Sequence, residues 1–99
     1  MASVAKMKAI DLIPIEHYET VFDYIPETGE LLDKEIGKQR GYKNADGMWI
    51  TFVPYKGHKW AMPAARIVVA MFEKQKCKKV IFIDGDKSNH RIENLEPRY

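Results

Sequence analysis

Side chains that could bind a metal ion or a phosphate are concentrated near the end of the chain, in the segment KKVIFIDGDKSNHRIENL. Two carboxylates, Asp84 and Asp86, precede Asn89 and His90, and oxygen ligands with an imidazole suit a hard or borderline divalent cation. These residue types also have structural uses, since Asp84 can cap the turn that it makes with Gly85, and Asp86 can cap the approach to a helix. Because this ligand set is small, the segment predicts no bound metal and no other cofactor.

The composition predicts one globular domain over residues 1–99. Of the 99 residues, 45% are hydrophobic and 30% are charged, which is typical of a folded chain with one modest core. The single cysteine has no partner in the chain for a disulfide and belongs to no CxxC pair that would bind zinc. No apolar run approaches the roughly 20 residues of a membrane helix, and the start has no signal-like segment, so we expect a cytoplasmic protein without a membrane partner.

The charge is divided unevenly along the chain. Residues 1–35 carry three lysines against eight acidic residues, a net charge of −5, whereas residues 36–99 carry thirteen Lys and Arg against six acidic residues, a net charge of +7. Lysines bind DNA phosphates by releasing counterions, and aromatic rings can stack on bases. The basic part therefore predicts a nucleic-acid surface, with a solvated sheet as the structural alternative and with Trp49 and Trp60 expected to cover the sheet.

The acidic part suggests a different partner. It could pack on the basic part of the chain, or it could bind a basic protein through aromatic side chains set between carboxylates. The structural alternative is a solvated helix face over the core. The residues of this candidate protein-binding surface are Glu16, Tyr18, Glu19, Phe22, Asp23 and Tyr24.

The hydrophobic pattern predicts an α+β fold. Helical spacing of apolar residues indicates an amphipathic helix over residues 15–25, which Pro26 ends. Alternating residues and glycine turns indicate a three-stranded antiparallel sheet over residues 30–62. A second helix is expected over residues 64–74 with Pro63 at its first position, followed by a strand, a turn and a short helix capped by Ser88 or Asn89.

Several of these segments together resemble the small HNH homing-endonuclease family common in bacteriophages. The resemblance runs from Phe22 to Glu96 through FDYIPETGELLDKE, a glycine-turned hairpin, AARIVVAMF and, most specifically, IDGDKSNHRIENLE. It implies a C-terminal strand-loop-helix unit of the ββα-metal type. In such nucleases this unit holds a general base and a divalent cation that together cut a phosphodiester.

The chain departs from the family pattern at the residues that would do this chemistry. The resemblance puts the acid or amide ligand at Ile81, the base histidine at Phe82 and the ligand from the helix at His90, while Ala65 replaces the histidine usual before Arg66. An isoleucine cannot coordinate a cation, and a phenylalanine ring has no lone pair that could accept a proton. The resemblance therefore implies a degenerate site in which His90 is the one surviving ligand.

We therefore expect a catalytically inactive HNH-like protein that binds duplex DNA. Arg66 has two predicted uses, a phosphate contact or a brace between the helix and the C-terminal loop. The other predicted contacts are Lys56, Lys59, Lys78, Lys79, Lys87 and Arg91 at phosphates, with Asn89 and His90 near the former scissile position. Two alternatives stay open. One is a phage inhibitor or regulator of a host nuclease, CRISPR or restriction effector or polymerase, and the other is an active metal-dependent nicking endonuclease.

Overall fold

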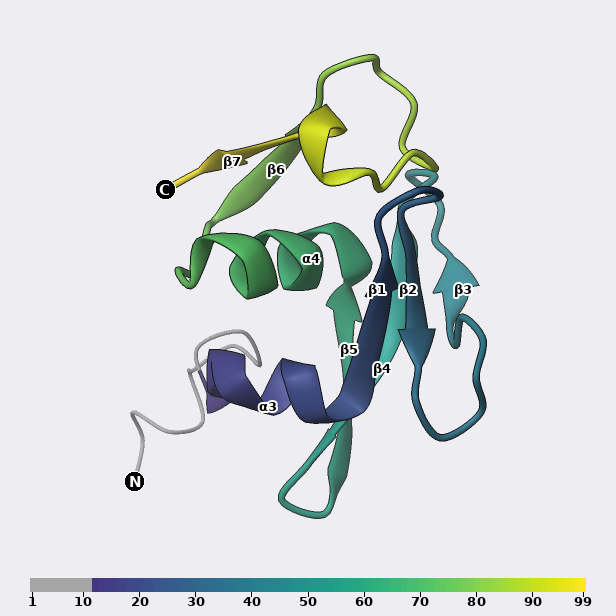
Figure 1. Ribbon diagram of the computed structural model, residues 1–99, viewed down its shortest axis with the longest axis vertical. Coiled ribbons are helices and arrows are strands. Elements are labelled where there is room, and N and C mark those ends of the chain that lie inside the picture. The colour runs from purple at the N-terminus through teal and green to yellow at the C-terminus, as the bar shows by residue number, and fades with distance from the viewer. Residues whose placement is uncertain (1–11) are drawn as a thin grey trace.

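Three antiparallel β-ribbons and a short helix surround one central helix in this protein, for which a computed structural model describes residues 12–99 (Figure 1). Figure 1 shows helix α4 between the β6–β7 ribbon and helix α3, with the other strands beside it. In chain order the elements are α3 (Ile15–Val21), β1 (Phe22–Ile25), β2 (Glu30–Asp33), β3 (Tyr42–Lys43), β4 (Trp49–Tyr55), β5 (His58–Pro63), α4 (Ala64–Glu73), β6 (Lys79–Phe82), the 3-10 turn η1 (Ile92–Asn94) and β7 (Leu95–Arg98). The expected α+β class is confirmed.

The first helix is shorter than predicted. It ends at Val21, and the backbone becomes extended at Phe22 (φ −124°, ψ 147°), so the expected helical residues 22–25 instead form strand β1. Strand β1 pairs with β2 in a hairpin, from Phe22 opposite Asp33 to Ile25 opposite Glu30. Helical spacing misled here because Tyr18 and Phe22 are both buried, one from the helix and the other from the strand.

The predicted sheet over residues 30–62 has a different membership. Strands β4 and β5 pair as expected, but the third strand of their sheet is β3, since β2 is already paired with β1. Val53 lies opposite Trp60 in this sheet, and Thr51 lies opposite Met62, so these side chains share a face. Trp49 and Trp60 pack against the core and donate their indole N–H groups to backbone oxygens, as expected for residues that cover a sheet.

Helix α4 is confirmed over Ala64–Glu73 and supplies the centre of the core. Six of its ten residues are buried, and they contribute to the same apolar cluster as Tyr18, Val53 and Leu95. Pro63 is the residue before the helix and the last residue of β5, so it precedes the position that we expected for it. The helix ends at Lys74 in the left-handed region (φ 55°).

None of the helices within residues 12–99 has the length and apolar content needed to span a membrane.

The expected C-terminal α-helix is absent from the described structure. Residues 88–91 are non-helical, only η1 is helical, and it begins after Arg91 rather than after Ser88 or Asn89. The chain then forms β7, which pairs with β6 from Lys79 opposite Arg98 to Phe82 opposite Leu95. Pairing with β6 satisfies the backbone groups that a longer helix would otherwise have used.

Candidate nucleic-acid interface

A pocket of about 520 Å³ lies beside strand β6, at the start of α4, and we call it the β6 pocket. Its apolar side chains come from β6, the first turn of α4, the end of β5 and the residue before β4, and its polar side chains are all basic. The lining residues are Met48, Pro63, Ala65, Arg66, Lys78, Lys79, Val80, Ile81, Phe82, Gly85 and Lys87. The pocket is thus an apolar concavity with cationic groups around it.

Ile81 and Phe82 are both half-buried walls of this pocket. Ala65, where the family pattern has a histidine, lines it from the helix side. The three positions that the resemblance assigns to polar groups therefore converge on one place, and hydrocarbon fills all three. No atom of these side chains can bind a cation or accept a proton from water.

His90 lies next to this pocket but is buried, with 7% of its surface exposed. Its ring meets Phe82 edge to face, with centroids 5.4 Å apart and planes at 81°. Its Nδ1 is 3.4 Å from the carbonyl oxygen of Ser88, and its own carbonyl accepts a hydrogen bond from the hydroxyl of Tyr24 (2.7 Å). Burial lowers the pKa of His90, partly opposed by the Ser88 carbonyl and the charge of Asp86. The imidazole is therefore a packed, neutral side chain near pH 7.

The backbone of His90 packs against the β1–β2 turn. Gly29 at this turn has φ +80°, and a Cβ placed on it would come within 2.5 Å of the Arg91 nitrogen and 2.6 Å of the His90 carbonyl carbon. Only a glycine allows the two backbones to approach this closely. The turn and the loop after β6 therefore form one packed unit.

Asp84 and Asp86 organise the loop after β6, Asp84 at the turn as expected and Asp86 within the loop rather than at the start of a helix. Asp84 accepts hydrogen bonds from the backbone N–H of Asp86 (2.8 Å) and from the amides of Asn89 (2.9 Å) and Asn94 (3.0 Å). Asp86 accepts from the N–H and the hydroxyl of Ser88. These bonds, led by that from Asn89 at Asp84 and that from Ser88 at Asp86, lower the pKa of both carboxyls.

The donor set does not fit the divalent cation that an HNH nuclease uses. Within residues 12–99 no group of three or more His, Cys, Asp or Glu side chains lies close enough together to hold a metal ion. His90 is turned against Phe82, and the two carboxylates are engaged by the loop itself. No chemical step through a metal follows from these residues.

Of the predicted phosphate contacts, four basic side chains come together at the β6 pocket: Arg66, Lys78, Lys79 and Lys87. The Nζ of Lys87 also donates to the carbonyl of Asp46 (2.8 Å), which joins the loop after β6 to the turn before β4. Lys56 and Lys59 lie elsewhere, at the tip of the β4–β5 hairpin, at the opposite end of the molecule from the loop after β6 (Figure 1). The structure thus separates the predicted lysines into two groups.

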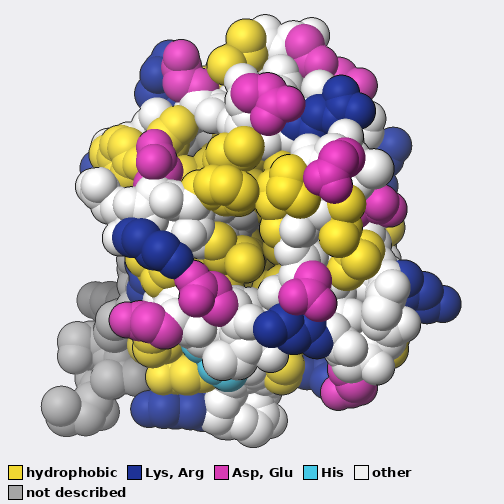
Figure 2. Space-filling model, in the orientation of Figure 1, with side chains coloured by type: hydrophobic (Ala, Val, Ile, Leu, Met, Phe, Trp, Pro, Cys, Tyr) yellow, Lys and Arg dark blue, Asp and Glu magenta, His cyan; other side chains and the backbone are white. Residues whose placement is uncertain are grey.

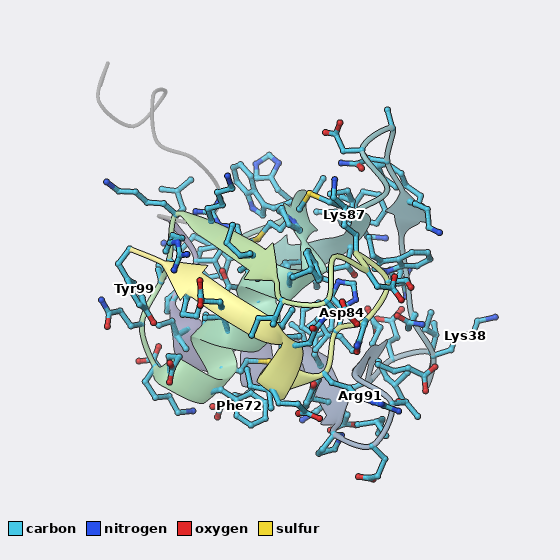
Figure 3. All side chains as sticks on the ribbon, turned by 90° about the horizontal axis from the view of Figure 1, so that it is seen from above. Lys38, Phe72, Asp84, Lys87, Arg91 and Tyr99 are labelled. Carbon is cyan, nitrogen blue, oxygen red and sulfur yellow. The ribbon has the colours of Figure 1, made fainter. Side chains whose placement is uncertain are left out.

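Arg66 and the two predicted contacts not yet placed, Arg91 and Asn89, have bonds within the protein. Arg66 donates from Nε and Nη2 to the carbonyl of Cys77 (3.1 and 2.6 Å), so it braces α4 against the approach to β6 and still lines the pocket. Arg91 donates to the carbonyl of Glu27 (2.9 Å). Figure 3, which views the molecule from above, shows Lys87 and Arg91 on opposite sides of Asp84. The amide of Asn89 is bound to Asp84, so it is a loop residue.

The aromatic anchors proposed for the acidic surface are largely buried, which corrects that expectation. Tyr18 has none of its surface exposed and Phe22 has 2%, and burial raises the pKa of Tyr18 to about 12. Both residues belong to the core and cannot contact a partner in this structure. Of the acidic residues in this set, Glu19 pairs with Lys74, and Asp23 lies 3.8 Å from Lys34.

A different apolar group is exposed on the same side of the molecule. Phe72 of α4 is 47% exposed and meets the ring of Tyr24 edge to face, with centroids 5.3 Å apart. Figure 2 shows hydrophobic side chains gathered in the middle of this face, with both acidic and basic side chains around them. Figure 3 places Phe72 on the side that faces the viewer of Figures 1 and 2, well apart from Lys87.

Sequence reasoning missed several residues of the site. Met48 and Pro63 line the β6 pocket, although both were assigned only to strand or helix packing. Asn94 is buried, and its side chain bonds the N–H and carboxylate of Asp84 and the carbonyl of Asn89. Its place within the RIENL part of the most specific motif was the one available signal. Gly29 also stands in a segment of the resemblance, FDYIPETGELLDKE, but that segment could not indicate its contact with His90 and Arg91, which lie far along the chain.

Comparisons with known proteins give a fold but no family assignment. The chain matches no protein-family model and no curated protein. Among solved structures it is similar to the HNH homing endonuclease I-HmuI, described for its DNA binding and cleavage, with a TM-score of 0.61 and 24% sequence identity. The similarity covers 84% of this chain and 49% of that one, so this chain spans about half of the solved protein. The chain therefore has an HNH-like α+β fold.

Proposed function

We propose that this chain is a DNA-binding module with the fold of an HNH nuclease and without its cleavage chemistry. The observation that carries the proposal is the β6 pocket, which Ile81 and Phe82 line together with Lys78, Lys79 and Lys87. We further infer that the chain is phage-encoded and acts in the bacterial cytoplasm, since the family that it resembles is common in bacteriophages.

The lack of cleavage follows from what the pocket offers to a phosphodiester. A nuclease must activate water with a base and stabilise the charge of the transition state, usually with a cation. In this pocket the side chains at the base and ligand positions are hydrocarbon, and His90 packs against Phe82 with a lowered pKa. None of these groups would activate water.

Binding to DNA does not require those lost groups. Four cations around one concave site can neutralise adjacent phosphates, and each such contact releases counterions that favour association. The hydrogen bonds of Arg66 and Lys87 to backbone carbonyls fix their positions relative to the pocket. Such contacts position a duplex without reading its sequence.

The proposal is tested by titrating a labelled DNA duplex with the protein at low and at moderate salt. We expect binding at 50 mM salt that weakens on the order of 10-fold or more at 200 mM, as for a protein that contacts several phosphates. Absence of binding at 50 mM would remove the proposal.

A supercoiled plasmid with magnesium or manganese tests the alternative of a live nicking enzyme. We expect the plasmid to remain supercoiled. Nicking by the wild-type protein that disappears in His90→Ala would show that the site is catalytic after all.

The exposed Phe72 beside Tyr24 favours a second candidate, in which the chain inhibits or regulates a host protein. The apolar pair lies on a face with charged side chains of both signs around it. Burial raises the pKa of Tyr24, a backbone hydrogen bond opposes this rise, and the charges of Glu93 and Arg91 act in opposite directions. Such a face suits a protein partner that presents an apolar side chain within a rim of charged residues.

This candidate predicts a stoichiometric complex that depends on Phe72. A single host protein should be retained from nuclease-treated bacterial lysate by the wild-type chain and by Tyr42→Ser, and it should be lost with Phe72→Ser. Tyr42 is a matched control because it is exposed to a similar extent, 48% against 47%. Equal retention by both variants would exclude this face.

A further inference from the structure

The β6 pocket is too apolar to be explained by phosphate binding alone. Among the described residues that line it there is no carboxylate, amide or hydroxyl side chain, and its apolar lining includes Ala65, Val80, Ile81 and Phe82. A phosphate moved against these apolar side chains would lose its hydration without gaining hydrogen bonds from them. The basic side chains of the lining can hold a phosphate, so the apolar part of the lining is left for another part of the ligand.

The ligand that fits this pocket has a flat apolar body joined to negative charge. A pocket of about 520 Å³ is within the range of small-molecule sites and has room for one aromatic ring system. The ring of Phe82 is held in one orientation by its edge-to-face contact with His90, so it offers a fixed wall. A single nucleotide combines both features, because its base has two apolar faces and its phosphates flank it.

We propose that the β6 pocket binds one unpaired nucleobase of DNA, with the flanking phosphates on Lys78, Lys79 and Lys87. This inference rests on the proposed DNA-binding function and names its substrate class. A base within an intact duplex has both faces stacked, and its extrusion is costly, so DNA that already carries an unpaired base is the preferred ligand.

The pocket provides little means to read which base it holds. Recognition of a base edge requires donors and acceptors matched to that edge, and the non-basic side chains of the pocket have neither. The four bases should therefore bind with similar affinity, and the unpaired state should matter more than the sequence.

The test compares an intact labelled duplex with the same duplex carrying one bulged thymine. We expect about 5- to 100-fold tighter binding of the bulged DNA, the range that stacking of one base supports. In Ile81→Ser this preference should be lost, so that the ratio of the two affinities falls towards 1. Ile83→Ser is the matched control, since Ile83 is 62% exposed, two residues further along, and does not line the pocket.

A second measurement uses only the wild-type protein, in case Ile81→Ser does not fold. With 2-aminopurine as the bulged base, we expect protein binding to shield its fluorescence from acrylamide, while the same base stacked in intact duplex shows no added protection. Unchanged quenching of the bulged base in the complex would overturn the inference.

The outcomes separate this inference from the function on which it rests. Equal, salt-dependent affinity for both DNAs would overturn the unpaired-base site and leave DNA binding in place. No binding of either DNA at 50 mM salt would remove both. Saturable binding of an acidic peptide with a central tryptophan, without any preference for bulged DNA, would assign the pocket to a protein partner and also overturn the inference.

Discussion

Two ends of this molecule carry the same kinds of residue in opposite surroundings. The loop after β6 has His90 buried against Phe82 and backed by the β1–β2 turn, with Lys78, Lys79 and Lys87 around an adjacent pocket. The tip of the β4–β5 hairpin has an exposed His58 and an exposed pair, Lys56 and Lys59. Its glycine, Gly57, has no atom near the position of a Cβ. Residue type alone therefore does not decide the surroundings of a lysine or a histidine here, because the fold packs one set around a pocket and leaves the other exposed.

The largest expected difference between the two ends is in the tolerance of their glycines. Gly29→Ala should lower the free energy of unfolding by about 2 to 5 kcal/mol, because the new Cβ would meet the backbone of His90 and Arg91 at a positive φ. Thermal or urea unfolding measures this loss.

Gly57→Ala is the matched control at the other end. Its φ is +79°, almost that of Gly29, but no atom lies within 4 Å of the added Cβ. The cost should therefore be about 1 to 2 kcal/mol from backbone conformation alone. Equal losses in the two variants would show that the β1–β2 turn does not pack on the loop.

The next effect concerns Asn94, which holds the loop after β6 from inside. Asn94→Ala should cost about 2 to 3 kcal/mol, because it removes bonds to Asp84 and Asn89 and leaves the Asp84 N–H without its partner in a half-buried place. Urea unfolding gives the loss of stability. Faster hydrogen exchange confined to residues 83–91 would show that the loop is the part released, whereas a variant as stable as wild type would contradict this role.

A smaller effect should appear in the dependence of stability on pH. Because burial lowers the pKa of His90 below its ordinary 6.5, the unfolded chain binds a proton that the folded chain does not. The contribution of His90 is complete above pH 6.5 and is lost as the pH falls below it, by at most about 1.4 kcal/mol per pH unit.

The pH slope can be assigned to His90 by comparing two histidine variants. Between pH 7.5 and 5.5, His90→Asn should show a flatter decline of stability than the wild type. His58→Asn, at the exposed hairpin tip, should keep the wild-type slope. A slope that His90→Asn leaves unchanged would mean that another group titrates.

The parts of the fold that the sequence predicted well are those with strong local patterns. The stripe of apolar residues in α4 is typical of a helix, and the alternation in β4 and β5 is typical of paired strands. All three elements were found in the structure. The helix predicted for the segment from Phe22 to Ile25 was wrong, because a residue that is buried in a strand can also match the spacing of buried residues in a helix. The sequence did not predict strand β7, because its pairing with β6 depends on a loop whose shape is set by hydrogen bonds to the side chains of Asp84 and Asp86.

The site was predictable only where a local motif carried it. The motif located Ile81, Phe82 and His90 together, and the structure places them together. It could not show that His90 is buried, since its covering partners are Tyr24, 66 positions earlier in the chain, and the turn at Gly29. The number of charges along the sequence could not separate the lysines at the pocket from those at the hairpin tip either, because only the folded chain places these two groups apart.

The salt dependence of DNA affinity in two matched charge variants tests whether DNA binds at the β6 pocket. Lys78→Gln/Lys79→Gln removes two charges at the β6 pocket, and Lys56→Gln/Lys59→Gln removes two at the hairpin tip. Each lost phosphate contact should lower the slope of log affinity against log salt by about 0.9, so we predict a loss of about 1 to 2 for the pocket pair and a clearly smaller loss for the tip pair. Equal losses for the two pairs, or wild-type binding that does not respond to salt, would contradict DNA binding at the β6 pocket.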